Sequence, residues 1–122
     1  MATKVLIVED EKALSEAYQT ILNQHGFVAS TAANGQEALA AVTKDAPDVI
    51  LLDIMMPKMN GIEFLQALHE KHIEEPNIIV FSNMDNQPEI DEAFRLGAKR
   101  YIVKSWASPQ DLVRVVNEAL EA

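Results

Sequence analysis

The sequence contains no cysteine, which excludes disulfides, thiolate zinc sites and cysteine nucleophiles. It is also poor in positive charge: 10 Lys and Arg residues stand against 19 Asp and Glu residues, a net charge of -9. This balance argues against direct nucleic-acid binding, because phosphate contacts need clustered Lys and Arg. No apolar run approaches the roughly 20 residues of a membrane span, and the N-terminus lacks the apolar stretch of a signal peptide. We therefore expect residues 1–122 to form one soluble, cytoplasmic, acidic domain.

Short apolar runs rich in β-branched residues recur along the chain. Runs of this length suit strands that are buried on both faces of a parallel sheet. The four strong runs are residues 5–8, 49–52, 78–81 and 101–103, and a weaker run at residues 27–29 predicts a fifth strand near an edge.

Amphipathic helical patterns lie between these runs. Asn34 with Glu37, and Asn60 with Glu63, have the spacing of helix capping boxes. The inner face of the last helix is predicted to comprise Leu112, Val115, Val116 and Leu120. Five consecutive strand–helix units indicate an α/β, doubly wound fold with a parallel sheet and helices on both faces. In such a sheet, ligands bind beyond the carboxyl ends of the strands.

Polar residues follow directly after four of the apolar runs. Glu9 and Asp10 follow the first run, and Asp53 follows the run at 49–52. Ser82 and Asn83 follow the next run, and Lys104 follows the last one. The carboxyl ends of parallel strands meet at one edge of the sheet, so we expect these residues to converge although they are far apart in the sequence.

The predicted cluster sets three carboxylates against one ammonium group. Two like charges about 5 Å apart repel by about 3 kcal/mol at an effective dielectric constant of about 20. Either one acid is protonated or a hard divalent cation binds, and an all-oxygen set of ligands favours Mg²⁺, with Mn²⁺ as the other candidate. Asp53 is of the right type to act as a nucleophile and form an acyl phosphate. Ser82 and Lys104 are of the right types to hold phosphoryl oxygens.

These residues resemble the receiver domain of two-component response regulators, and the resemblance extends from Val5 to Ala119. The matching stretches are Val8-Glu9-Asp10-Glu11, Leu51-Leu52-Asp53-Ile54-Met55-Met56-Pro57 with Asn60-Gly61, Phe81-Ser82, and Tyr101-Ile102-Val103-Lys104. The family implies a flavodoxin-like fold whose five parallel strands have the order 2-1-3-4-5.

The resemblance also implies a role for each site residue. Asp53 corresponds to the phosphoacceptor, which takes a phosphoryl group from a sensor histidine kinase or a phosphotransfer protein. Asp10, Asp53 and the backbone carbonyl of Met55 correspond to direct Mg²⁺ ligands, and Glu9 to a ligand acting through water. Such a protein is a phosphoacceptor and not an enzyme, apart from Mg²⁺-dependent self-phosphorylation from small donors and self-dephosphorylation.

A conformational switch is implied as well. Lys104, the Ser82 hydroxyl and the backbone N–H of Asn83 correspond to the groups that bind the phosphoryl oxygens. Ser82 and Tyr101 correspond to the pair whose movement changes the face made by the fourth helix, fifth strand and fifth helix. That face would contact a downstream protein or output domain, and it is also a candidate for homodimerisation. Its predicted contact residues are Glu92, Arg95, Lys99, Tyr101 and the surface near Arg114.

The main alternative is a receiver fold that acts as an interaction module without being phosphorylated. A phosphohydrolase with an aspartyl nucleophile is less well supported, because Met55 stands where such enzymes carry a general acid two residues after the nucleophile. A flavin carrier of the same topology is also less well supported, since no glycine-rich phosphate-binding loop follows the first strand.

Overall fold

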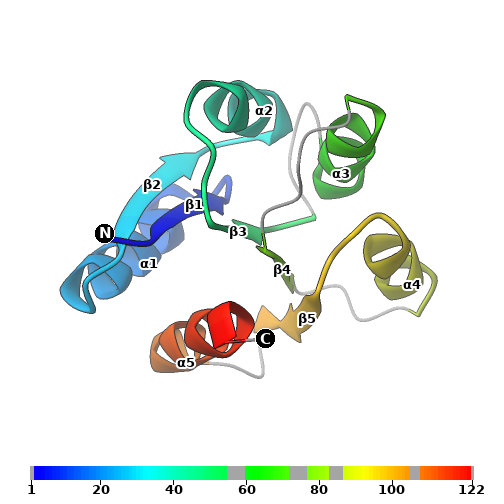
Figure 1. Ribbon diagram of the computed structural model, residues 1–122. Helices are drawn as coiled ribbons and strands as arrows, with labels where there is room; N and C mark the ends of the chain where they lie inside the picture. The colour runs from blue at the N-terminus through cyan, green and yellow to red at the C-terminus, as the bar shows by residue number, and fades with distance from the viewer. Residues whose placement is uncertain (1, 55–59, 72–76, 83–86, 105–107, 122) are drawn as a thin grey trace.

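The computed structural model describes residues 2–54, 60–71, 77–82, 87–104 and 108–121. Within these ranges, five strands alternate with five helices (Figure 1). In order these elements are β1 (Lys4–Val8), α1 (Lys12–Gln24), β2 (Val28–Ala32), α2 (Gly35–Lys44), β3 (Val49–Leu52), α3 (Gly61–Glu70), β4 (Asn77–Ser82), α4 (Gln87–Arg95), β5 (Arg100–Val103) and α5 (Pro109–Glu121).

All five strands belong to one parallel sheet with the order β2-β1-β3-β4-β5. The predicted α/β class and the strand order implied by the resemblance are both confirmed. The middle parts of the central strands β1, β3 and β4 are apolar because helices cover both faces of the sheet. All four residues of β3 are buried, for example.

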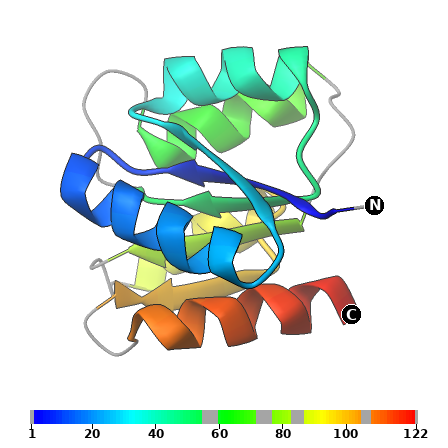
Figure 2. The ribbon, with the colours of Figure 1, turned by 90° about the vertical axis from the view of Figure 1, so that its left-hand side faces the viewer.

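The helices form one layer on each side of the sheet. In Figure 2, α2 and α3 lie above the strands, α1 lies in front of them and α5 lies below them. Two buried apolar clusters correspond to the layers. One joins the sheet to α2, α3 and α4 through residues such as Phe64, and the other joins it to α1 and α5 through residues such as Leu112. No helix in the described ranges has both the length and the apolar character needed to cross a bilayer.

The strand predicted near an edge is indeed the edge strand β2, but it extends to Ala32, three residues beyond the predicted run at 27–29. Only Ala29 and Ala32 are buried in it, and Val28 is 54% exposed. An edge strand with one exposed face tolerates polar residues, so its apolar pattern is short although its ladder with β1 is complete.

Asparagine side chains cap the N-termini of α2 and α3. The Asn34 side chain accepts a hydrogen bond from the Glu37 N–H at 2.9 Å. At α3, the Asn60 side chain accepts from the Glu63 N–H at 2.9 Å while Glu63 accepts from the Asn60 N–H at 3.1 Å. Both predicted caps are therefore present.

One core prediction was wrong: Leu120 is 37% exposed, because it lies in the last turn of α5 at the margin of the buried stripe.

Candidate functional site

Backbone pairing places Glu9 and Asp53 side by side. Val8 pairs with Leu52 in the ladder between β1 and β3, so the next residue of each strand emerges at the same edge of the sheet. The Asp53 N–H donates to the Val8 carbonyl oxygen at 3.0 Å, and the Glu9 N–H donates to the Ala32 carbonyl oxygen at the same distance. The two acids are therefore held by the sheet and not by a flexible loop.

Three carboxylates converge at this edge, as the sequence predicted. Glu9, Asp10 and Asp53 each offer an oxygen within 4.8 Å of the others. Glu9 and Asp53 are buried, at 4% and 6% exposure, whereas Asp10 is exposed. The cluster is thus open to solvent on the side of Asp10 and closed beneath the other two acids.

Lys104 comes from the opposite half of the sheet and contacts both buried acids. It follows β5, and its Nζ donates to Glu9 Oε2 and to Asp53 Oδ2, the latter at 3.2 Å. The other oxygen of Glu9, Oε1, accepts from the Glu11 N–H at 3.2 Å. One ammonium group is therefore shared between two carboxylates.

The directions of the pKa shifts in the cluster indicate that the Lys104 ammonium group does not offset the negative charge of both buried acids. Burial raises the pKa of Glu9 to about 7, with a further increase from the charge of Asp53, although the Lys104 hydrogen bond opposes the shift. For Lys104, burial lowers the pKa, but the hydrogen bond to Glu9 and the charge of Asp53 outweigh it, so the pKa lies above its usual value. The excess negative charge is thus relieved by a proton on Glu9 or by a second cation.

The donor set fits a hard divalent cation. All three acids offer carboxylate oxygens, one of them at the solvent-facing side where bound waters could complete the coordination. Such a set suits Mg²⁺ or Mn²⁺ better than metals that prefer nitrogen or sulfur ligands.

Ser82 lies at the same end of the sheet as this cluster, and Tyr101 lies three residues before Lys104 in β5. Ser82 is the last residue of β4, is fully buried and pairs with Val103, the residue before Lys104. Tyr101 is partly buried and packs against the apolar core cluster that joins the sheet to α2, α3 and α4. The predicted backbone groups of Met55 and Asn83 lie outside the described residues.

Gly61 has a geometric role that its spacing alone did not reveal. Its N–H donates to the Ile54 carbonyl oxygen at 3.0 Å, which places the start of α3 against the chain that carries Asp53. A Cβ at position 61 would lie 2.7 Å from both the Asp53 carbonyl oxygen and the Ile54 Cα. Only glycine allows this close approach without moving the backbone of the candidate phosphoacceptor.

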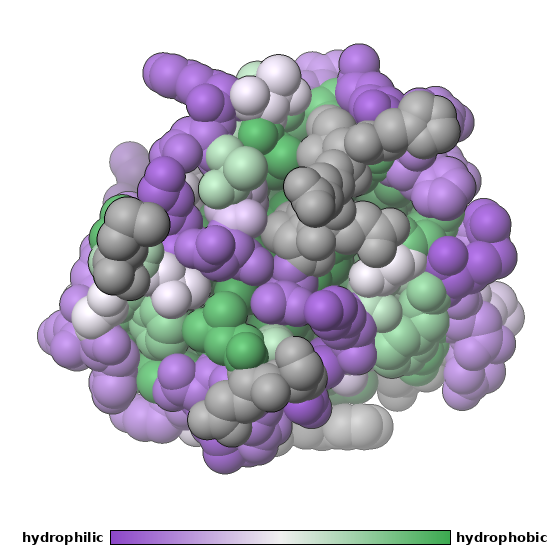
Figure 3. Space-filling view, in the orientation of Figure 1, coloured by the Kyte–Doolittle hydropathy of each residue, from purple (hydrophilic) through white to green (hydrophobic). Residues whose placement is uncertain are grey.

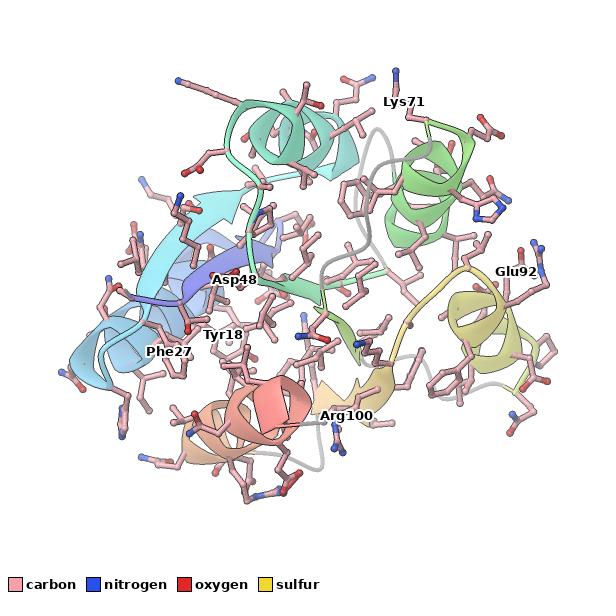
Figure 4. The ribbon with its side chains drawn as sticks, viewed as in Figure 1. Tyr18, Phe27, Asp48, Lys71, Glu92 and Arg100 are labelled. Carbon is pink, nitrogen blue, oxygen red and sulfur yellow. The ribbon has the colours of Figure 1, made fainter. Side chains whose placement is uncertain are left out.

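Tyr18, on α1, is not among the site residues predicted from the sequence. It is buried, and it lines a small cavity together with Glu9 and Asp53. Figure 4 labels Tyr18, which extends from α1 on the side of the sheet that faces α5. The signal in the sequence was a hydroxyl group on an otherwise apolar helix face, eight residues after Asp10.

Comparison with known proteins gives consistent matches. The family model of the response regulator receiver domain matches residues 5–117. The chain is 38% identical to the chemotaxis protein CheY of Thermotoga maritima over 121 residues, which cover 97% of this chain and 98% of that protein. It is 32% identical over 112 residues to the transcriptional regulatory protein DltR of Streptococcus agalactiae, covering 92% of this chain. The chain spans about half the length of DltR and of the response regulator MprA.

Solved structures of receiver-type proteins also match this chain over nearly its whole length. A CheY-like receiver domain from Methanospirillum hungatei superposes with a TM-score of 0.92 at 28% identity, covering 99% of this chain and 95% of that one. The chemotaxis protein CheY4 of Vibrio cholerae superposes with a TM-score of 0.89 at 29% identity, covering 98% and 99%.

Proposed function

The chain belongs to the family of response regulator receiver domains, and from that premise we propose that residues 1–122 form one receiver domain that accepts a phosphoryl group on Asp53. The resemblance drawn from the motifs is confirmed by the family match and by the CheY-like structures. The observation that carries the proposal is the cluster itself, in which Lys104 binds two buried acids, Glu9 and Asp53, beside an exposed third acid.

The proposed reaction is a phosphoryl transfer from a phosphohistidine of a sensor kinase or phosphotransfer protein. A carboxylate oxygen of Asp53 bonds to phosphorus, the bond from phosphorus to the imidazole nitrogen breaks, and its electron pair leaves with the imidazole. The product is an acyl phosphate. Asp53 is suited to this role because it is fixed by the Val8 backbone and is only 6% exposed.

Asp10, Asp53 and the Met55 carbonyl would hold Mg²⁺ directly and Glu9 would hold it through water, with Mn²⁺ as a substitute. When bound, this ion supplies positive charge that offsets the acids and the phosphoryl oxygens. The convergence of the three carboxylates and the raised pKa of Glu9 support the assignment, because both indicate more negative charge than Lys104 offsets.

Lys104 and Ser82 then form the phosphoryl-binding side of the site, with the backbone N–H of Asn83. Phosphorylation adds about -1.5 to -2 charge units and strong hydrogen-bond acceptors. Lys104 Nζ is already within 3.2 Å of Asp53 Oδ2, so a small displacement brings it to an oxygen of the new group. The Ser82 side chain lies at the end of the adjacent strand.

The proposed output is a population shift on the α4–β5–α5 face. Movement of Ser82 toward the phosphoryl group would let Tyr101 turn inward against the α2–α3–α4 cluster, on which it already packs. Converting a 1:99 population to 99:1 needs about 5.5 kcal/mol, which a few hydrogen bonds to charged groups, at about 1.5–3 kcal/mol each, can supply.

The partners follow from the same proposal. The upstream partner is a sensor histidine kinase or phosphotransfer protein. The downstream partner is a protein target or an output domain, with a homodimer through the α4–β5–α5 face as a further candidate. The predicted contact residues Arg95, Lys99 and Arg114 are exposed, and Glu92 is partly exposed. The proposal includes a cytoplasmic location and a role as phosphoacceptor and not as an enzyme, both supported by the family.

Acetyl phosphate and Mg²⁺ test the proposal directly. We expect the intact protein to gain the mass of one phosphoryl group, and the fluorescence of its single tryptophan, Trp106, to change with Mg²⁺ and with beryllium fluoride. Asp53→Asn should abolish the mass gain. Asp45→Asn is the matched control, because Asp45 is an exposed acid that pairs with Lys4 at the opposite edge of the sheet. A folded wild-type protein whose mass stays unchanged would instead favour the phosphorylation-independent interaction module.

A further inference from the structure

A small cavity lies directly beneath the candidate phosphorylation site, between the sheet and α1 and α5. Its volume is about 10 Å³, close to the space that one water molecule needs. Its polar lining residues are Glu9, Asp53 and Tyr18, and the rest of the lining is apolar, including Phe81. A tyrosine of α1 therefore lines a water-sized space together with two acidic residues of the site.

The packing of the Tyr18 ring fixes where this hydroxyl lies. The ring is 6% exposed and meets Phe81 edge to face, with ring centroids 5.5 Å apart and an interplanar angle of 85°. Within the described ranges, no direct hydrogen bond involves the Tyr18 hydroxyl. The cavity has polar lining residues on one side and a volume near that of one water, so a single water in it could link the Tyr18 hydroxyl to the acids.

Electrostatics support the same relation. Burial raises the pKa of Tyr18 to about 12, and the negative charges of Glu9, Asp53 and Glu11 add to the shift. The phenol therefore keeps its proton at neutral pH, so it faces the carboxylates as a hydrogen-bond donor.

We propose that Tyr18 is a positioning residue of the site: its hydroxyl donates, through one water in this cavity, to the buried carboxylate of Glu9. Glu9 is then held from three directions, by Lys104, by the Glu11 N–H and from below by Tyr18. This inference rests on the proposed function, because the orientation of Glu9 matters only if Glu9 helps to bind a cation.

The role of Tyr18 becomes largest when Lys104 is drawn away. In the proposed mechanism, Lys104 turns toward the phosphoryl group and weakens its contact with Glu9. The Glu11 N–H and the Tyr18 hydroxyl then remain as donors that keep Glu9 ionised and correctly oriented for the water-mediated contact to Mg²⁺. Groups that orient metal ligands in this way affect metal affinity although they do not touch the metal.

Tyr18→Phe is the direct test, because it removes the hydroxyl and keeps the ring that packs on Phe81. We expect the Mg²⁺ affinity, measured by Trp106 fluorescence, to fall by roughly threefold to tenfold, the effect of about one hydrogen bond. Thr43→Val is the control, because it removes an exposed hydroxyl on α2 that bonds only to its own helix at the Leu39 carbonyl. Its Mg²⁺ affinity should equal that of the wild type.

A metal-free measurement separates positioning from packing. The chain has two tyrosines, so protein labelled with [ζ-¹³C]tyrosine gives two NMR signals. We expect the Tyr18 signal to shift in Glu9→Gln and to stay unchanged in Glu70→Gln, an exposed glutamate on α3.

Equal Mg²⁺ affinity of the wild type and Tyr18→Phe, or a Tyr18 signal that ignores Glu9→Gln, would overturn this inference while leaving the proposed function intact. A wild-type protein that neither binds Mg²⁺ nor accepts a phosphoryl group would overturn the proposed function itself.

Discussion

Glu9 should make the metal-free protein less stable as the pH rises, and the variant Glu9→Gln should remove that loss. Burial raises the pKa of Glu9 from its usual value of 4.5 to about 7 in the folded protein. Between these two pH values the folded state binds more protons at Glu9 than the unfolded state does. The free energy of unfolding therefore falls with rising pH across this window, the opposite of the behaviour of a stabilising surface carboxylate.

The size of the effect follows from the shift. One pKa unit corresponds to about 1.4 kcal/mol, so complete ionisation of Glu9 in the folded state costs on the order of 3 kcal/mol. Glutamine has nearly the same shape and can still accept from Lys104, but it does not ionise. We therefore expect the difference in unfolding free energy, Glu9→Gln minus wild type, to grow by roughly 2–3 kcal/mol from pH 4.5 to pH 8 and to level off above pH 7.

Urea unfolding followed by circular dichroism, in EDTA at several pH values, measures this difference. Glu70→Gln serves as the matched control, because Glu70 is an exposed glutamate on α3 and the substitution makes the same chemical change outside the site. Added Mg²⁺ should narrow the gap at pH 8, since a ligand at 100 times its dissociation constant stabilises the folded state by about 2.7 kcal/mol. A difference between Glu9→Gln and wild type that stays constant from pH 4.5 to pH 8 would refute the reasoning.

Two further predictions concern the neighbours of this acid. Gly61→Ala should destabilise the protein by roughly 1–3 kcal/mol and slow its phosphorylation by acetyl phosphate. The reason is that the new Cβ would lie 2.7 Å from backbone atoms of Asp53 and Ile54. Normal stability and a normal rate of phosphorylation would contradict this prediction. Lys104→Met should raise the pKa of Glu9 further, because it removes the hydrogen bond that now lowers it, and an NMR titration of the Glu9 side-chain carboxyl carbon would show a higher midpoint than in the wild type. An unchanged midpoint would mean that Lys104 does not neutralise Glu9.

Topology explains why so much of the site was predictable from the sequence. Apolar runs located the strands, and a parallel sheet brings the residues after those runs to one edge whatever their separation in the chain. Glu9 and Lys104, 95 residues apart, meet for this reason. Sequence pattern also located the Asn34 and Asn60 caps, since capping depends on residues only three positions apart.

What the sequence did not reveal depends on distances between elements. The close approach of Gly61 to Asp53 is set by how α3 packs on the sheet, which no local pattern encodes. The position of the Tyr18 hydroxyl depends on how α1 packs against Phe81. The full length of β2 was missed because its pairing with β1 comes from backbone hydrogen bonds, while its exposed face carries residues such as Ser30 and Thr31.

The charge arrangement also implies that cation binding and phosphorylation are coupled. In the metal-free protein Lys104 is occupied by Glu9 and Asp53, and burial leaves little water to screen the two acids. A phosphoryl group on Asp53 adds about -1.5 to -2 charge units and competes for the same ammonium group. If Lys104 turns to the phosphoryl oxygens, Glu9 must gain a proton or a second cation, because an unpaired buried carboxylate costs several kcal/mol. Under the proposed function, a divalent cation would therefore serve less to build the site than to release Lys104 for the incoming group.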